Sequence, residues 1–166
     1  MSQLELNCVV EIPKGSRNKY EYDANLGGIK LDRFMSASVV YPTDYGFVPN
    51  TLAPDGDPLD VLVCVSEPTF PGCIVPSRVV GLFKMADEKG EDDHVVCVPR
   101  HDPGWNRLEN LDDIPPELRA EITHFFTVYK DLDPDRFSEA KGWDDRDAAL
   151  LTIERARARY QQTLVG

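Results

Sequence analysis

The chain has 166 residues, of which 42% are hydrophobic and 28% charged, a composition typical of globular proteins. Its net charge of −11 and estimated pI of 4.6 argue against nonspecific binding to nucleic acid or to an anionic membrane. No apolar run approaches the roughly 20 residues that a membrane-spanning helix needs. We therefore expect one globular domain over residues 1–166, with neither nucleic acid nor membrane as a partner.

The cysteines and the first residues bear on the cellular compartment. The four cysteines form no CxxC pair, and Cys8, Cys64 and Cys97 lie in apolar runs where a reduced thiol packs as a small hydrophobic group. The opening segment has no basic stretch before its apolar part, so it does not resemble a secretion signal. Free thiols without such a signal favour a cytoplasmic protein over a disulfide scaffold.

The first two thirds of the chain predicts β-structure. Runs of β-branched and aromatic residues predict strands, in chain order, at residues 6–12, 19–23, 29–34, 59–65, 74–85 and 94–98. The second and third strands read as a hairpin around the turn-rich stretch 25–28. Residues 41–58 are rich in proline, glycine, tyrosine and aspartate and show no clear period, so we expect a long functional loop there.

The last third predicts two helices. Pro116 suits a first helical position, and the apolar spacing that follows is helical: Leu118, Ile122, Phe125 and Tyr129. A second helix should begin after Asp144 or Asp145 as N-cap, with one face formed by Ala149, Ile153, Ala156 and Tyr160. Strands followed by helices indicate an α+β fold with a mainly antiparallel sheet or barrel.

Two acidic clusters stand at strand ends. The stretch DGDPLDVLV places Asp55, Asp57 and Asp60 at the start of a strand, where a solvated turn is the simpler reading. The stretch MADEKGEDDH lies between two strands and alone reads as a charged hairpin turn; its acids are Asp87, Glu88, Glu91, Asp92 and Asp93. A barrel could bring the clusters together. Facing carboxylates with no softer ligand nearby would then suit Mg²⁺ or Mn²⁺.

Basic and phenolic residues complete the pattern. They are Arg17, Lys19, Arg33 and Lys130, with Tyr41, Tyr45 and Tyr129 close by in sequence. Each alone reads most simply as a surface charge or a core aromatic, but together with bound metals they would suit a polyanion. The chain has no GxxxxGK[ST] loop and no GxGxxG after a strand, and its aspartates do not follow EF-hand spacing.

These motifs, in order, resemble those of soluble inorganic pyrophosphatases of the first family, prokaryotic type. The matching stretches are EIPKGSRNKYEYD, LDRF, YPTDYGFVPNTLAPDGDPLDVLV, GLFKMADEKGEDD and HFFTVYKDL. The resemblance implies a five-stranded OB-like Greek-key β-barrel with flanking C-terminal helices. It also implies metal-dependent hydrolysis of pyrophosphate to two phosphates by direct attack of a metal-activated water. Mg²⁺ is the implied cofactor, with Mn²⁺ as a substitute and Ca²⁺ as an inhibitor, and the implied assembly is a homohexamer of two stacked trimers.

The resemblance also implies a role for each site residue. Asp57 would accept the proton of the attacking water. The carboxylates on the metal side would be Asp55, Asp60 and Asp92 for the activating metals, and Asp87, Glu11 and Glu21 around the metals that arrive with substrate. The groups in contact with the two phosphoryl groups would be Lys19, Arg33, Tyr45, Tyr129 and Lys130, with Tyr41 supporting them.

One position departs from the family pattern. Two residues after Asp92 the family usually has a lysine, and this chain has His94. We consider two readings of His94. It is either a weaker, pH-sensitive cation at the edge of the site, or a histidine that is tolerated because Lys89 or solvent takes over the role of the lysine. Two alternative functions also stay open at this point. They are hydrolysis of another phosphate compound, and a non-catalytic OB-type module that binds metal or phosphate.

Overall fold

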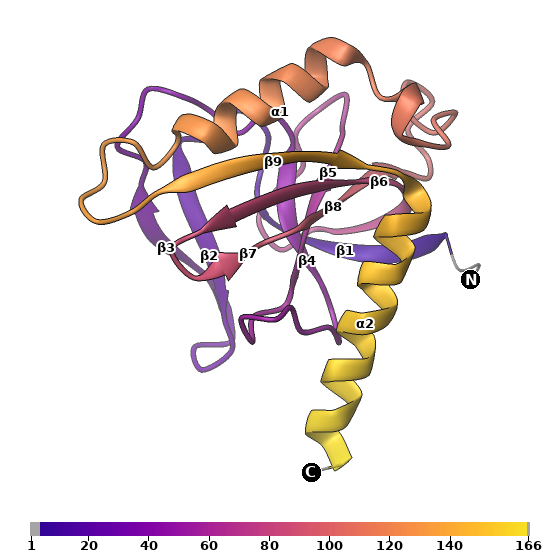
Figure 1. Cartoon of the computed structure of the whole chain (residues 1–166), viewed down its shortest axis with the longest axis horizontal. Coiled ribbons are helices and arrows are strands. Elements are labelled where there is room, and N and C mark those ends of the chain that lie inside the picture. Colours follow the sequence, from indigo (N-terminus) through magenta and orange to yellow (C-terminus); the bar gives the residue numbers. More distant parts are fainter. Residues whose placement is uncertain (1–3, 166) are drawn as a thin grey trace.

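The computed structural model describes residues 4–165; residues 1–3 and 166 of the expected domain lie outside the described part. Five strands form a closed barrel: β1 (Glu5–Ile12), β4 (Asp44–Val48), β5 (Leu59–Val63), β8 (His94–Pro99) and β6 (Ile74–Asp87). They are neighbours in that order, and pairing between β1 and β6 closes the ring (Figure 1). Only the β5–β8 pair within this ring is parallel. The expected five-stranded α+β barrel is confirmed.

Shorter strands extend the barrel and flank it. β7 (Gly90–Glu91) and β9 (Ser138–Asp144) both pair with β6. β2 (Asn18–Asp23) and β3 (Gly28–Phe34) form a separate two-stranded sheet, which confirms the predicted hairpin. This hairpin is attached to the barrel in part by the backbone N–H of Tyr22, which donates to Glu11 Oε2 at 2.8 Å. It therefore forms a wall beside the barrel mouth (Figure 1).

The helices cover the barrel where the periodicity predicts. After a short 3₁₀ turn (Leu111–Asp113), α1 (Pro116–Val128) buries Ile122, Phe125 and Phe126 against the barrel. Asp145 caps α2 (Arg146–Val165), since its Oδ1 accepts from the N–H of Ala148 at 2.9 Å. The last buried side chain of α2 is Ala156, and the following turns extend past the barrel (Figure 1). Within residues 4–165, no helix combines the length and apolar character needed to cross a membrane.

Two strands, β4 and β9, were not predicted from the sequence, and the prediction of an irregular loop over residues 41–58 is wrong. Strand β4 lies inside the segment 41–58 that was expected to be irregular. It has only five residues, DYGFV, and begins at Asp44, a type that usually marks a turn. Asp44 is nevertheless fully buried, because its carboxylate accepts from the N–H of Lys14 at 2.8 Å and the hydroxyl of Thr69 at 2.6 Å. Strand β9 was missed because its polar sequence, SEAKGWD, has the character of an exposed edge.

Candidate active site

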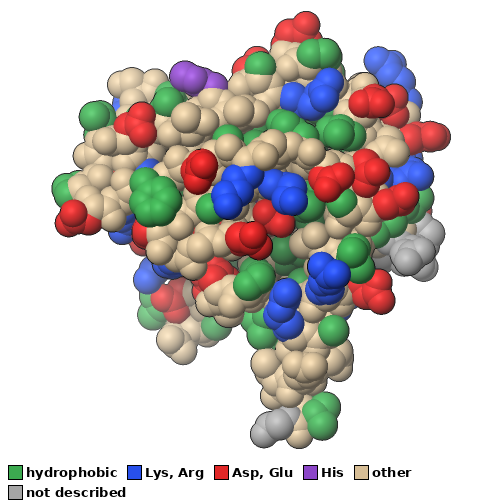
Figure 2. All heavy atoms as spheres, in the orientation of Figure 1, with side chains coloured by type: hydrophobic (Ala, Val, Ile, Leu, Met, Phe, Trp, Pro, Cys, Tyr) green, Lys and Arg blue, Asp and Glu red, His purple; other side chains and the backbone are tan. Residues whose placement is uncertain are grey.

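The two acidic clusters converge on one cavity at the barrel mouth. The first cluster enters from the segment before β5, and the second from the connection between β6 and β8. The cavity has a volume of about 440 Å³, and its lining includes twelve of the thirteen site residues expected from the sequence: Glu11, Lys19, Glu21, Arg33, Tyr45, Asp55, Asp57, Asp60, Asp87, Asp92, Tyr129 and Lys130. On the face that Figure 2 shows, acidic and basic side chains are mixed around β9. The convergence of the two clusters, which are far apart in the sequence, gives the cavity its many carboxylates.

Tyr41 is the expected site residue that does not line the cavity. It is 2% exposed and lies behind Tyr45, with the two ring centroids 5.5 Å apart. Its other face packs on Phe125 of α1 at 4.5 Å. Burial raises the pKa of Tyr41 far above its usual value, so its hydroxyl stays protonated. Tyr41 therefore contacts the ring of Tyr45 and does not reach the cavity itself.

The basic side chains of the cavity are held by carboxylates. Lys19 Nζ lies 3.0 Å from Asp32 Oδ2 on the paired strand of the hairpin, and Arg33 Nη1 lies 3.9 Å from Asp133 Oδ2. Lys130 Nζ lies 3.2 Å from Asp87 Oδ2. These pairs keep the cations at the cavity without a bound anion.

Three acidic partners of these cations were not assigned a role from the sequence: Asp32, Glu88 and Asp133. Glu88 Oε2 lies 3.3 Å from Lys130 Nζ, so this lysine contacts two carboxylates. The only sequence signal for Asp32 was its position beside Arg33 in LDRF. Asp133 gave none, because its contact with Arg33 depends on how the segment after α1 crosses to the hairpin.

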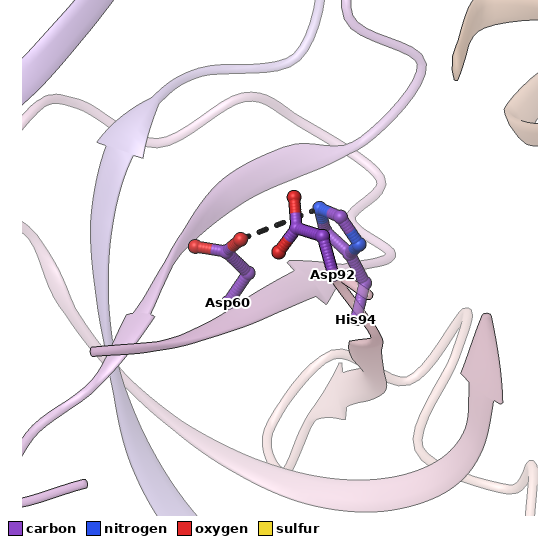
Figure 3. Close-up of side chains that lie close together, drawn as sticks. All are labelled: Asp60, Asp92 and His94. Carbon is purple, nitrogen blue, oxygen red and sulfur yellow. Dashed lines mark ion pairs between the residues drawn. The ribbon is translucent and has the colours of Figure 1, made fainter. Parts of the chain in front are cut away.

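The carboxylates destabilise one another in the charged form. Burial and the nearby charge of Asp92 raise the pKa of Asp60 well above its usual value. Burial raises the pKa of Glu11 to about 7, partly offset by the hydrogen bond from Tyr22 N–H. Burial also raises the pKa of Asp55. A divalent cation would relieve this cost, and one ligand atom each from Asp60, Asp92 and His94 already lies within 4.8 Å of the others (Figure 3). The donor set therefore fits a divalent metal.

The position of His94 corrects one expectation. Its side chain is 1% exposed, and its Nε2 lies 3.6 Å from Asp60 Oδ2. The site was expected to hold only hard oxygen ligands, but the imidazole brings a nitrogen to the carboxylate cluster. The reason is strand register: Val61 on β5 pairs with Val95 on β8, so the preceding residues, Asp60 and His94, are also neighbours.

Metal-free protein should lose stability as the pH rises from about 4.5 to about 7. A carboxyl whose pKa is raised in the folded state keeps its proton where the unfolded chain has released it, so the free energy of unfolding falls across that range. For Glu11 the range runs from 4.5 to about 7, and the loss amounts to about 3 kcal/mol. Thermal unfolding of EDTA-treated protein across this range measures the loss, which Glu11→Gln should reduce.

Mg²⁺ should oppose this loss, because it binds the ionised carboxylates of the folded state. We expect Mg²⁺ to raise the Tm more at pH 7 than at pH 5. A Tm at pH 7 that does not respond to millimolar Mg²⁺ would show that the clustered carboxylates do not bind the ion.

A small closed barrel with a carboxylate cluster facing lysine, arginine and tyrosine side chains defines a metal-dependent enzyme that acts on phosphate groups. Comparison with known proteins narrows this class. The sequence model of the inorganic pyrophosphatase family matches residues 8–161. The chain belongs to the inorganic pyrophosphatase family.

Individual relatives agree with this assignment over nearly the whole chain. The inorganic pyrophosphatase of Methanosarcina acetivorans is 52% identical over 154 residues, which cover 93% of this chain and 91% of the relative. That of Streptomyces coelicolor is 51% identical over 158 residues, covering 95% and 97%. The crystal structure of the Thermus thermophilus inorganic pyrophosphatase superimposes with a TM-score of 0.93 at 46% identity, covering 95% of this chain and 92% of that chain. The fold and the arrangement of its elements are therefore those of the family.

Proposed function

We propose that the chain hydrolyses inorganic pyrophosphate to two phosphates in the cavity at the barrel mouth, with Mg²⁺ as the preferred cofactor. The observation that carries this proposal is the charge composition of the cavity: the proposed metal-ligating carboxylates line it together with Lys19, Arg33 and Lys130. Pyrophosphate is a compact anion that needs both. The carboxylates that would hold the metals are Asp55, Asp60 and Asp92, with Asp87, Glu11 and Glu21 around the metals that accompany substrate.

The basic side chains of the cavity would bind and orient the two phosphoryl groups. Lys19 and Arg33 project from the hairpin, and Lys130 follows α1, so the substrate would be held from two directions. Tyr45 and Tyr129 would donate hydrogen bonds to phosphoryl oxygens. Burial, followed by nearby charges, raises the pKa of both phenols well above the usual value, so they remain neutral donors at neutral pH.

Asp57 would act as the general base. It is exposed at the cavity between two proposed metal ligands, and its own backbone N–H donates to Asp55 Oδ1 at 2.9 Å, which fixes the turn. Bound divalent ions would neutralise phosphoryl oxygens and lower the pKa of the attacking water. Asp57 would then accept its proton, while Arg33 and the lysines stabilise charge on the leaving phosphate.

The decisive test is release of phosphate from pyrophosphate by purified protein with Mg²⁺, repeated with EDTA. We expect rapid, EDTA-sensitive hydrolysis of pyrophosphate and much slower hydrolysis of ATP under the same conditions. Faster hydrolysis of ATP would favour the alternative of another phosphate substrate. Metal or phosphate binding without hydrolysis of either compound would favour a non-catalytic module.

Ca²⁺ as the only metal should bind to the carboxylate cluster yet support hydrolysis more than about tenfold slower than Mg²⁺. Ca²⁺ has longer bonds and looser coordination than the near-octahedral Mg²⁺, so the reacting groups would not be held in the same geometry. Steady-state rates with each metal, and inhibition of the Mg²⁺ reaction by added Ca²⁺, test this. Rates with Ca²⁺ equal to those with Mg²⁺ would contradict it.

We also propose, from the family likeness, that the chain forms a homohexamer of two stacked trimers in the cytoplasm. Exposed large apolar side chains outside the cavity offer surface for such contacts, among them Phe34, Phe70 and Ile74. Light scattering coupled to gel filtration would test the assembly. A mass of about six times 18.7 kDa is expected, and a monomeric mass would refute the assembly.

A further inference from the structure

His94 belongs both to the barrel and to the cluster that it forms with Asp60 and Asp92. It is the first residue of β8, beside Asp60 on the parallel strand β5, and Asp92 lies two residues before it. Its Nε2 is 3.6 Å from Asp60 Oδ2. Figure 3 shows the imidazole and the two carboxylates converging on one region, and their ligand atoms all lie within 4.8 Å of one another.

The imidazole is held in place but its nitrogens are not satisfied. The ring packs against Phe126 at 4.9 Å, Tyr45 at 5.7 Å and Phe83 at 6.3 Å between centroids, and these contacts hold it beside the carboxylates. Nδ1 has no hydrogen-bond partner among the described residues. The 3.6 Å approach of Nε2 to Asp60 is longer than a hydrogen bond. Nε2 therefore faces Asp60 without a hydrogen bond and remains open to a ligand on that side.

A divalent ion fits that place better than a direct ion pair does. Ligand atoms about 2.1 Å from one ion lie roughly 3 to 4 Å apart, so the cluster needs only a small closure to surround an ion. The positive ion would also offset the repulsion between the negative charges of Asp60 and Asp92.

We propose that His94 Nε2 ligates the same divalent ion as Asp60 and Asp92, and that this nitrogen shifts the position toward Co²⁺ and Zn²⁺ relative to Mg²⁺. The inference rests on the proposed function in taking both aspartates as metal ligands. Imidazole suits the later first-row transition ions, whereas Mg²⁺ takes oxygen ligands and retains water. A lysine, the residue the family usually has there, would offer an ammonium group and no ligand.

The size of the preference is limited by the surroundings of the ring. Histidine ligands usually donate their second N–H to an acceptor, an interaction worth about 10- to 100-fold in metal affinity. Nδ1 of His94 lacks that acceptor among the described residues. The selectivity for Co²⁺ over Mg²⁺ should therefore be moderate, and Mn²⁺, the lowest in the transition series, should gain least from the nitrogen.

The test compares metal binding by the whole protein and two variants. His94→Phe keeps a ring between Phe126 and Tyr45 but has no ligand atom, and His94→Gln replaces the nitrogen with an amide. The matched control is His124→Gln, because His124 is exposed on α1. Calorimetric titration of EDTA-treated protein should show Co²⁺ affinity about tenfold or more weaker in both His94 variants. Mg²⁺ affinity should change less than about threefold, and the control should match the unmodified chain.

Spectroscopy can detect a nitrogen ligand of the bound ion directly. Pulsed electron paramagnetic resonance of bound Mn²⁺ should detect coupling to a ¹⁴N nucleus in the unmodified chain and in His124→Gln, and no such coupling in His94→Phe. Absence of the coupling in the unmodified chain would overturn the inference even if a variant failed to fold. Equal loss of Co²⁺ and Mg²⁺ affinity in the folded variants would also overturn it and leave His94 as a packing residue paired with Asp60.

The same preparations separate this inference from the proposed function. Pyrophosphate hydrolysis with Mg²⁺ is assayed on the unmodified chain without reference to His94. Nitrogen coupling without hydrolysis would support the ligand and refute the proposed function, while hydrolysis without nitrogen coupling would do the reverse.

Discussion

Asp57→Asn should lower the kcat for pyrophosphate by two orders of magnitude or more while the protein stays folded and still binds metal. The carboxamide has the shape of the carboxylate but cannot accept a proton, and a positioned general base contributes about 100- to 10,000-fold. Folding should be preserved because Asp57 is exposed and its backbone N–H, not its side chain, makes the hydrogen bond to Asp55.

The matched control for this substitution is Asp93→Asn. Asp93 belongs to the second acidic cluster but does not line the cavity, so its kcat should stay within about twofold of the unmodified chain. Steady-state kinetics with saturating Mg²⁺, together with Mg²⁺ titration and circular dichroism of each variant, would separate lost chemistry from lost metal binding. A folded Asp57→Asn protein with nearly unmodified kcat would remove Asp57 from the role of general base.

Most of the fold could be predicted because its elements carry strong local patterns. Alternating apolar residues in β1, a long β-branched run in β6 and the spacing of Ile122 and Phe125 in α1 each identify an element without tertiary information. Strands β4 and β9 could not be found this way. The first depends on burial of Asp44 through contacts with Lys14 and Thr69, and the second depends on the exposed edge of β6 that it covers.

The contacts of the site also divide into those that the sequence predicts and those that it does not. Asp55, Asp57 and Asp60 lie within six residues, so their association is visible in the sequence, and the family resemblance brought in residues from distant segments. The contact between Asp60 and His94 was not visible, since it follows from the parallel register of β5 and β8. The pairing of Arg33 with Asp133 could not be predicted either. It depends on where the segment after α1 crosses the hairpin, and such a crossing leaves no periodic pattern in the sequence.

Gly46→Ala should prevent the barrel from folding, with a loss of more than about 4 kcal/mol in the free energy of unfolding. Gly46 lies in the middle of β4, opposite Val10 of β1 and Val61 of β5. A Cβ at this position would lie 1.9 Å from the carbonyl oxygen of Val9 and 2.9 Å from the Cα of Val10. Both neighbours are backbone atoms of a paired strand, so no side chain can rotate away, and β1 and β4 would have to separate. Tyr45, beside it in β4, would lose its place in the cavity.

Gly81→Ala is the matched control, since Gly81 is also a buried strand glycine beside a register shift in the barrel. A Cβ there would meet the carbonyl oxygen of Asp144 at 3.4 Å and Cδ1 of Ile114 at 3.6 Å, which are ordinary contacts. Its stability should change by less than about 1 kcal/mol, as for other well-accommodated substitutions. Chemical denaturation followed by circular dichroism compares the two variants with the unmodified chain. If Gly46→Ala unfolded at the same denaturant concentration as Gly81→Ala, the close approach of β1 to β4 would not constrain the barrel. The presence of glycine at residue 46 would then need another explanation.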